Sequence, residues 1–265
     1  MPQARETPVH ISAERGDLTK VDVDAIVNAA NSTLLGGGGV DGAIHAAAGP
    51  KLLEACRRLR RTDLPDGLPP GEAVATDGFD LPARWVIHTV GPNWNRGQRD
   101  PAVLGHCFTR SLNVANGLGA TSVAFPAISA GAYGWDVDVV ARTAVAAVRD
   151  WQTLVNLRHH CSTDPRWCRW RGTGDRQLDP KDVLVVIGHP WGDIETTLSG
   201  WIATGPGSRP MVSLSSARLR STGEPIPLDQ IDDPWRLGRA PSVTEVRFVL
   251  FTASALAAFT EALAA

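Results

Sequence analysis

The sequence has neither a long hydrophobic run nor an apolar leader. No stretch of about 18 consecutive apolar residues occurs, which is roughly what a helix needs to span a bilayer. The first residues, Met1 to Glu6, lack the hydrophobic centre of a signal peptide. We therefore expect a cytoplasmic protein that makes no membrane contact.

The chain also lacks an excess of charge of one sign and is poor in cysteine. Its 26 Lys and Arg residues are balanced by 28 Asp and Glu residues, so no general attraction to nucleic acid or to an anionic membrane is indicated. Any phosphate binding must then come from local backbone geometry. Four cysteines in 265 residues, without regular spacing, are more typical of reduced thiols than of a disulfide framework.

Length and composition leave the number of domains open. A chain of 265 residues with 43% hydrophobic residues can form one large domain or two small ones, and either can bury a substantial core.

Glycine, by contrast, is concentrated at one place. The apolar strand predicted at residues 24–27 leads into Asn28 and Asn31, and four consecutive glycines follow at residues 36–39. Glycine loses more backbone entropy on folding than any other residue and adds no packing, so this run must serve backbone geometry. It directs N–H groups into a helix predicted to begin at Val40, and such a helix start attracts anions.

Two polar residues follow the glycines on one face of that helix. Asp41 and His45 lie four positions apart, which is one helical turn, so both can act on the same bound atom. The simpler interpretation is a solvated glycine loop followed by a surface Asp and an unremarkable His. The combination with Asn31 and the glycine run favours a functional site.

A second loop of small residues repeats this arrangement. The predicted buried strand 122–128 leads into Ser129-Ala130-Gly131-Ala132-Tyr133-Gly134-Trp135, and a helix follows with Asp136 or Asp138 as its N-cap. If the two strands are neighbours, the two loops form a crevice lined by backbone groups and suited to a pyrophosphate.

Hydrophobic patterning and turn residues predict the other elements. His88 lies inside an apolar strand, where a histidine is more often a hydrogen-bonded core residue than a ligand or base, and we interpret it as structural. Strands are predicted at residues 9–15, 72–76, 84–92 and 243–251, and helices at residues 50–59, 101–117, from 136 to near Trp151, and 252–265.

The segment from Asn28 to His45 resembles the signature of a known family. Its letters, NAANSTLLGGGGVDGAIH, are similar to those of macrodomains of the MacroD type, the ADP-ribosyl hydrolases and O-acetyl-ADP-ribose deacetylases. The resemblance implies an α/β fold of three layers, α/β/α, with a mixed, mostly parallel central sheet. ADP-ribose would bind over the carboxyl edge of that sheet. The macrodomain would comprise residues 1–151 and 243–265.

The resemblance also implies roles for individual residues. Asn31 would hydrogen-bond the distal ribose, Asp41 would orient or deprotonate the attacking water, and His45 would position Asp41 or relay a proton. Asp17, which on residues alone is simply a turn residue, would bind the adenine amino group. The remaining ligand contacts would be Leu18 and Phe251 at the adenine, Gly38, Gly39, Val40, Ser129, Ala130, Gly131 and Ala132 at the diphosphate, and Tyr133 at the distal ribose.

The activity implied is hydrolysis of ADP-ribose esters. The substrates would be mono-ADP-ribose on Glu or Asp side chains of a modified protein, O-acetyl-ADP-ribose, or both, with no cofactor and with the chain as a monomer. Some macrodomains use a catalytic zinc, but Asp41 stands in the glycine segment where theirs has metal ligands, so we expect no metal. A non-catalytic ADP-ribose reader is the competing class, and such readers tend to lack an Asp at this position.

Residues 152–242, here called the insert, match nothing in that family pattern. We expect irregular, partly ordered chain, especially from Gly200 to Pro241, apart from a strand-like run at residues 182–188. His159, His160, Cys161 and Cys168 suggest zinc, although their spacing is not that of a standard finger. The alternation of Arg and Trp at residues 166–171 suits nucleic acid or, more simply, a lid or a partner-docking patch.

Overall fold

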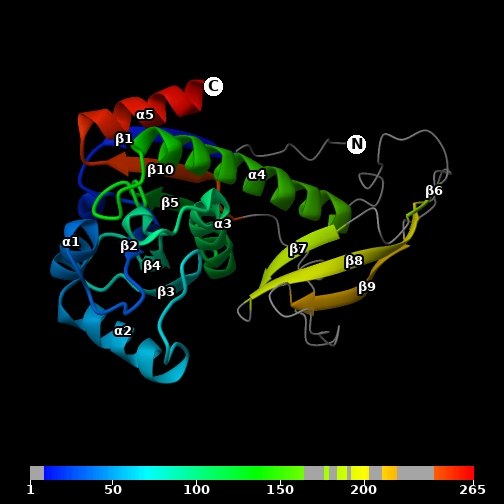
Figure 1. Cartoon of the computed structure of the whole chain (residues 1–265), viewed down its shortest axis with the longest axis horizontal. Coiled ribbons are helices and arrows are strands. Elements are labelled where there is room, and N and C mark those ends of the chain that lie inside the picture. Colours follow the sequence, from blue (N-terminus) through cyan, green and yellow to red (C-terminus); the bar gives the residue numbers. More distant parts are fainter. Residues whose placement is uncertain (1–8, 164–175, 179–183, 190–191, 203–210, 220–241) are drawn as a thin grey trace. The chain divides into compact units, whose positions relative to one another are not determined.

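The structure is a computed structural model that describes residues 9–163, 176–178, 184–189, 192–202, 211–219 and 242–265 (Figure 1). The chain divides into two compact units. The first comprises Met1–Thr153 and Pro241–Ala265, and the second comprises Leu154–Ala240.

The first unit alternates strands and helices. Its strands are β1 (His10–Arg15), β2 (Ala25–Ala30), β3 (Ala73–Asp77), β4 (Trp85–Val90), β5 (Ser122–Phe125) and β10 (Glu245–Leu250). Its helices are α1 (Gly39–Ala48), α2 (Pro50–Thr62), α3 (Pro101–Leu118), α4 (Val137–Thr163, which continues into the second unit) and α5 (Ala253–Ala264), with short 3-10 turns η1 (Leu18–Lys20) and η2 (Trp94–Arg96).

The six strands form one mixed, mostly parallel sheet in the order β1-β10-β5-β2-β4-β3. Only β3 runs antiparallel, beside β4 at one edge, and every other neighbouring pair is parallel. The two strands that precede the small-residue loops, β2 and β5, are hydrogen-bonded neighbours, with Ala25 opposite Val123. The predicted α/β fold with a mostly parallel sheet is confirmed.

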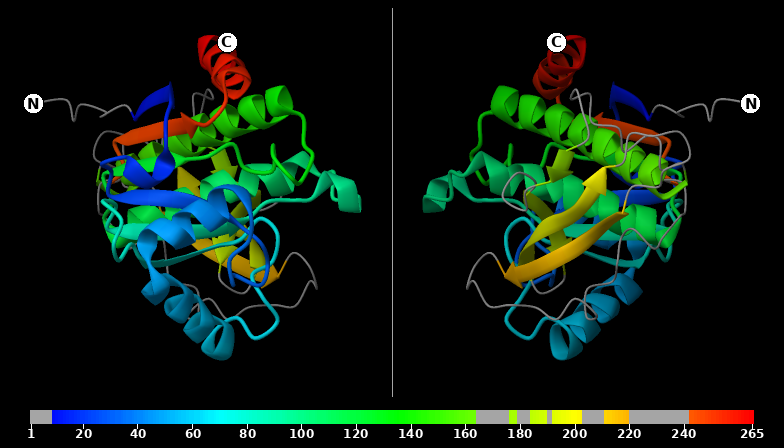
Figure 2. Two further views of the ribbon diagram at one scale, coloured as in Figure 1. Left: turned by 90° about the vertical axis from the view of Figure 1, so that its left-hand side faces the viewer. Right: turned by 90° about the vertical axis from the view of Figure 1, so that its right-hand side faces the viewer.

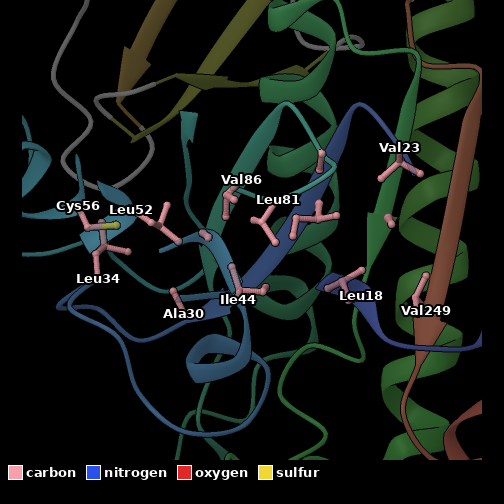
Figure 3. Close-up of a cluster of buried hydrophobic side chains, with 14 of the residues drawn as sticks. Leu18, Val23, Ala30, Leu34, Ile44, Leu52, Cys56, Leu81, Val86 and Val249 are labelled. Atoms are coloured by element: carbon pink, nitrogen blue, oxygen red, sulfur yellow. The ribbon is translucent and has the colours of Figure 1, made fainter. Parts of the chain in front are cut away.

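Strand side chains alternate between two cores, one on each face of the sheet. Ile26, Val86 and Val249 belong to the core on the face covered by α1 and α2, which also contains Ile44 and Leu52. Figure 3 labels Val86, Val249, Ile44 and Leu52 in this core. These side chains are 4% exposed or less, so this face of the sheet is closed to water. It is also the face to which β2 presents its polar residue, Asn28.

An aromatic cluster fills the opposite face. Phe248 of β10 lies 4.7 Å, centroid to centroid, from Phe259 of α5, and it also contacts Phe125 of β5 and Phe108 of α3. Arg149 of α4 donates to the carbonyl of Leu263, which ties α4 to α5. Both views of Figure 2 show α5 (red) above α4 (green), on the side of the unit away from α2.

Helix ends follow the predicted capping chemistry. The carboxylate of Asp100 accepts from the N–H of Ala102 at the start of α3. Asp136, rather than Asp138, caps α4, since its Oδ1 accepts from the N–H groups of Asp138 and Val139.

Helix α4 is longer than predicted. Its predicted end is near Trp151, whereas the helix continues to Thr163. Residues 152–163 contain neither Gly nor Pro, so nothing in them breaks a helix, and Pro165 is the first residue that disfavours one. His159, His160 and Cys161 therefore belong to the helical backbone.

The second unit contains an antiparallel sheet. Its strands are β6 (Arg176–Leu178), β7 (Leu184–His189), β8 (Gly192–Ile202) and β9 (Met211–Leu219), with β8 pairing with each of the other three. The strand predicted at residues 182–188 is confirmed as β7. The prediction of irregular chain from Gly200 to Pro241 is wrong for the end of β8 and for β9. The serine-rich composition of β9 does not predict a strand. Strand formation depends more on pairing with a neighbour than on intrinsic propensity.

Candidate functional site

The predicted site lies at the carboxyl edge of the sheet. Because β1, β10, β5 and β2 are parallel, their carboxyl ends meet at one edge, which lies on the left in Figure 1. The segments that follow these strands contain all the predicted catalytic and ligand-binding residues. An open parallel sheet typically binds ligands in a crevice at this edge.

Asn31 organises the glycine loop, which comprises residues 31–39. Its Nδ2 donates to the carbonyl of Gly36 at 2.9 Å, and its Oδ1 accepts from the N–H of Thr33 at 3.0 Å and from the Thr33 hydroxyl. The loop turns back at Gly36, whose φ of +85° favours glycine. The predicted hydrogen bond from Asn31 to a ribose remains a prediction, and in the structure this side chain holds the loop closed.

The start of helix α1 is open on its outer side. Gly38 is the N-cap residue and has no side-chain cap, so N–H groups of the first turn have no partner from a capping side chain. A Cβ added at Gly38 or Gly39 would meet no atom within 4 Å, and the same holds for Gly131 in the second loop. Backbone N–H groups at an uncapped helix start form an anion-binding arrangement.

Asp41 lies beneath this loop and is nearly buried, with 4% of its surface exposed. Its Oδ1 accepts a hydrogen bond of 2.7 Å from Nδ2 of Asn28. Its Oδ2 has no hydrogen-bond partner and lies 2.9 Å from where a Cβ on Gly37 would be. Nε2 of His45 is 3.5 Å from Oδ1. The helical spacing thus brings Asp41 and His45 together as predicted.

Asn28 connects Asp41 to a buried histidine. Nδ2 of Asn28 is also 3.1 Å from Nδ1 of His88, whose Nε2 is 3.0 Å from the hydroxyl of Thr76 and 3.8 Å from Sγ of Cys56. His88 is fully buried, and this burial lowers its pKa from 6.5 to about 3, with a smaller contribution from His45. The interpretation of His88 as a hydrogen-bonded core residue is confirmed.

No role is predicted for Asn28 from the sequence. The available signal was a polar residue inside an otherwise apolar strand: Asn28 is 0% exposed. A buried amide of this kind needs hydrogen-bond partners, but the sequence alone does not say which ones.

The second loop, residues 129–135, has a strained backbone at Ser129 and packs closely against Gly91. Ser129 has a φ of +68°, unusual for a residue other than glycine, and its buried hydroxyl has no hydrogen-bond partner. The hydroxyl fits there because the facing residue is Gly91, where a Cβ would lie 2.1 Å from Oγ of Ser129. The loop therefore has its shape only with a glycine opposite.

The segment after β4, for which the sequence predicts no role, supports this loop. The N–H of Trp94 donates to the carbonyl of Tyr133, and Nδ2 of Asn95 donates to the carbonyl of Ala132. The Trp94 ring packs edge-on against Trp135, with centroids 5.3 Å apart. Tyr133 is partly buried, whereas Ala132 is exposed.

The predicted adenine contacts lie at the ends of β1 and β10. The carboxylate of Asp17 accepts from the N–H and hydroxyl of Thr19, which lowers its pKa, and it caps η1. The side chain of Leu18 is 4% exposed and packs in the core, whereas that of Phe251 is 85% exposed. An exposed aromatic ring of this kind is available for stacking.

The zinc alternative concerns side chains that the structure does not describe. Side chains of His159, His160 and Cys161, and all of Cys168, lie outside the described residues, as does the Arg and Trp alternation at residues 166–171. Among the described residues, no three His, Cys, Asp or Glu side chains are grouped as metal ligands would be.

In the part of the chain that the structure describes, no helix has the length and apolar character required to cross a membrane.

Comparison with known proteins agrees with this geometry. The family model described as Macro domain matches residues 27–144. A macro domain-containing protein of Streptomyces coelicolor is 56% identical over 145 residues, which cover 55% of this chain and 86% of that protein. A solved macrodomain of Oceanobacillus iheyensis with ADP has a TM-score of 0.60 at 28% identity, covering 95% of this chain and 88% of that one. A glycine-to-valine variant of the same macrodomain, solved with ADPR, has a TM-score of 0.57 at 27% identity, covering 95% and 90%.

Fold and site thus define a mixed α/β domain with two backbone loops at the carboxyl edge of its sheet. The chain belongs to the macrodomain family.

Proposed function

We propose that this chain binds ADP-ribose and hydrolyses its esters, as MacroD-type macrodomains do. The substrates would be mono-ADP-ribose on Glu or Asp side chains, O-acetyl-ADP-ribose, or both. Support for binding comes from the open helix start at Gly38 and from the likeness to structures solved with ADP and with ADPR.

The observation that carries the hydrolase proposal is the state of Asp41. One carboxylate oxygen is held by Asn28, and the other is buried beneath the glycine loop without a partner. A buried acceptor without a hydrogen bond is costly, so a carboxylate held this way suits a substrate hydroxyl or a water that donates to it. Oδ2 of Asp41 and the amide of Asn31 both lie near Gly37, so the two side chains are close enough to act on one bound group.

In the reaction we propose, water attacks the ester at its acyl carbon. The bond between the acyl carbon and the ribose oxygen breaks, the acyl group keeps the water's OH, and the ribose oxygen takes the other proton. Asp41 orients the water or accepts its proton, Asn31 holds the distal ribose, and His45 positions Asp41 or relays the proton. Asp17, Leu18 and Phe251 would contact adenine. The diphosphate would lie between residues 38–40 and 129–132, with Tyr133 against the ribose.

The test compares wild type with Asp41→Ala. Calorimetry measures ADP-ribose affinity, and a time course measures release of ADP-ribose from a glutamate-modified peptide and of acetate from O-acetyl-ADP-ribose. We expect Asp41→Ala to bind ADP-ribose and to turn over at least about tenfold more slowly. Asp150→Ala, which removes an exposed carboxylate on α4, is the matched control and should behave as wild type.

Each outcome has a distinct meaning. Equal turnover by wild type and Asp41→Ala would refute the role of Asp41. Binding without turnover of either substrate by wild type would favour the non-catalytic reader. No heat of binding with ADP-ribose at millimolar concentration would refute the whole proposal.

A further inference from the structure

A line of polar side chains crosses the core on the α1 and α2 face of the sheet. Thr76 is on β3, His88 on β4 and Asn28 on β2, three strands that are adjacent in the sheet. All three residues are buried, and the line ends at Asp41 on α1. The same face is otherwise packed with aliphatic side chains such as Ile26 and Val86.

Hydrogen-bond inventory determines the direction of each bond. The amide of Asn28 has two N–H donors, one of which donates to Oδ1 of Asp41, because a carboxylate can only accept. The other donor points to Nδ1 of His88, which must then be the unprotonated nitrogen. The ring proton is therefore on Nε2 and donates to the hydroxyl of Thr76. Burial keeps the His88 ring neutral, with a pKa of about 3.

The hydrogen bonds of this line fix Asp41, but they do not pair every buried polar atom of the line itself. Oδ1 of Asn28 is buried and has no partner, although both amide protons are used. A core polar group retained only for stability would be expected to satisfy its acceptor as well. What the arrangement does achieve is to fix one oxygen of Asp41, and with it the direction of the free oxygen.

We propose that His88 is a positioning residue that acts through Asn28 to hold the Asp41 carboxylate in one orientation, with Thr76 setting the tautomer of His88. The proposal rests on the proposed function, because it gives the orientation of Asp41 a purpose. The simpler alternative is that the line contributes to stability alone. The two differ in what His88 variants do to Asp41 and to turnover when the fold is intact.

The first experiment uses two substitutions of His88. The side-chain oxygen of Asn can occupy the position of Nδ1, so His88→Asn keeps an acceptor for Asn28, whereas His88→Leu removes it. We expect His88→Leu to lower kcat about tenfold with ADP-ribose affinity within about twofold of wild type, and His88→Asn to recover most of the loss. His106→Leu, on α3, is the matched control and should leave both quantities unchanged.

Thr76→Val provides a milder variant should His88→Leu fail to fold. It is nearly isosteric and removes only the acceptor of the Nε2 proton. We expect a smaller fall in kcat than for His88→Leu, again without a change in affinity. A loss of affinity in step with kcat, or a fall in thermal stability with kcat unchanged, would overturn the positioning role.

Two spectroscopic readouts do not depend on turnover. Nitrogen NMR of the imidazoles should show Nδ1 of His88 unprotonated and its proton on Nε2, and carbon NMR should show a shift of the Asp41 carboxyl signal in His88→Leu. The opposite tautomer, or an unmoved Asp41 signal, would refute this proposal even if the enzyme is active. An inactive wild type with both signals as expected would instead refute the proposed function and leave the line as a means of orienting Asp41 for ligand binding.

Discussion

At the scale of single residues, Gly37 is a position in the site where a side chain has no room. It has no positive φ, so an alanine there would not strain the backbone. A Cβ would instead lie 2.9 Å from Oδ2 of Asp41 and 3.2 Å from Nδ2 of Asn31. Both side chains are held by other hydrogen bonds, so neither can retreat without breaking one. Position 37 requires glycine because a Cβ does not fit there, whereas position 36 favours glycine because its φ is positive.

We therefore expect Gly37→Ala to lower ester turnover on the order of tenfold, because displacement of a reacting group is costly. ADP-ribose affinity should stay within about threefold, since backbone N–H groups are unchanged. Calorimetry and the ester time course measure the two effects. Gly117→Ala, at an exposed position of α3 where a Cβ meets nothing within 4 Å, is the control. Wild-type turnover by Gly37→Ala would contradict this account of the site.

At the scale of elements, the site depends on β2 and β5 remaining side by side. Asp24, just before β2, provides a polar link, because its Oδ2 accepts from the N–H and hydroxyl of Thr121 at 2.7 and 2.6 Å and from the N–H of Ser122 at 3.2 Å. These hydrogen bonds lower the pKa of Asp24 below 3.8, and the bond from the Thr121 hydroxyl contributes most to the shift. They favour the charged form in the folded state only.

The sign of the pH dependence follows from this lowered pKa. Stability from Asp24 is fully present above about pH 4 and is lost as the pH falls through the folded-state value. We expect Asp24→Asn to reduce the free energy of unfolding by about 1–2 kcal/mol at pH 7. The difference from wild type should shrink toward pH 3.

Urea unfolding at several pH values measures this difference. The control is Asp66→Asn, an exposed Asp in the loop after α2, which should cost little at any pH. A penalty for Asp24→Asn that is the same at pH 7 and pH 3 would show that the charge of Asp24 does not link the strands.

At the scale of the whole molecule, the two ends of the insert meet on one turn of α3. Nε1 of Trp151 donates to Oδ1 of Asn113 at 2.8 Å, and the N–H of Ser242 donates to Oδ1 of Asn116 at 2.8 Å. Asn113 and Asn116 are three positions apart on a helix, so they are neighbours on its surface. The chain thus leaves and re-enters the first unit at nearly the same place.

A short linker should therefore replace residues 154–240. With about ten Gly and Ser residues in their place, we expect ADP-ribose affinity and ester turnover within about threefold of the full chain, because closing a short flexible loop costs little. Binding and turnover are measured separately. Retained binding with lost turnover would mean that the insert takes part in the reaction, and loss of both with an intact fold would assign it the main role.

In the first unit, local patterns in the sequence determined the order of strands and helices and the small-residue loops. Helical spacing alone placed Asp41 and His45 on one face, and the glycine run marked an open helix start, because such features depend on neighbours within a few positions. The end of α4 was predicted wrongly, although the signal was local, since neither Gly nor Pro occurs between Trp151 and Pro165.

Only the tertiary structure decided what lies behind Asp41 and which strands adjoin. The contact of Asn28 with His88 joins residues 60 positions apart, and it exists because β2 and β4 pair in one particular register. Likewise, β9 forms a strand because it pairs with β8, and its own composition would not predict a strand. Pairing between distant segments is set by the free energy of the whole sheet and its cores, and for that reason no local pattern in the sequence encodes it.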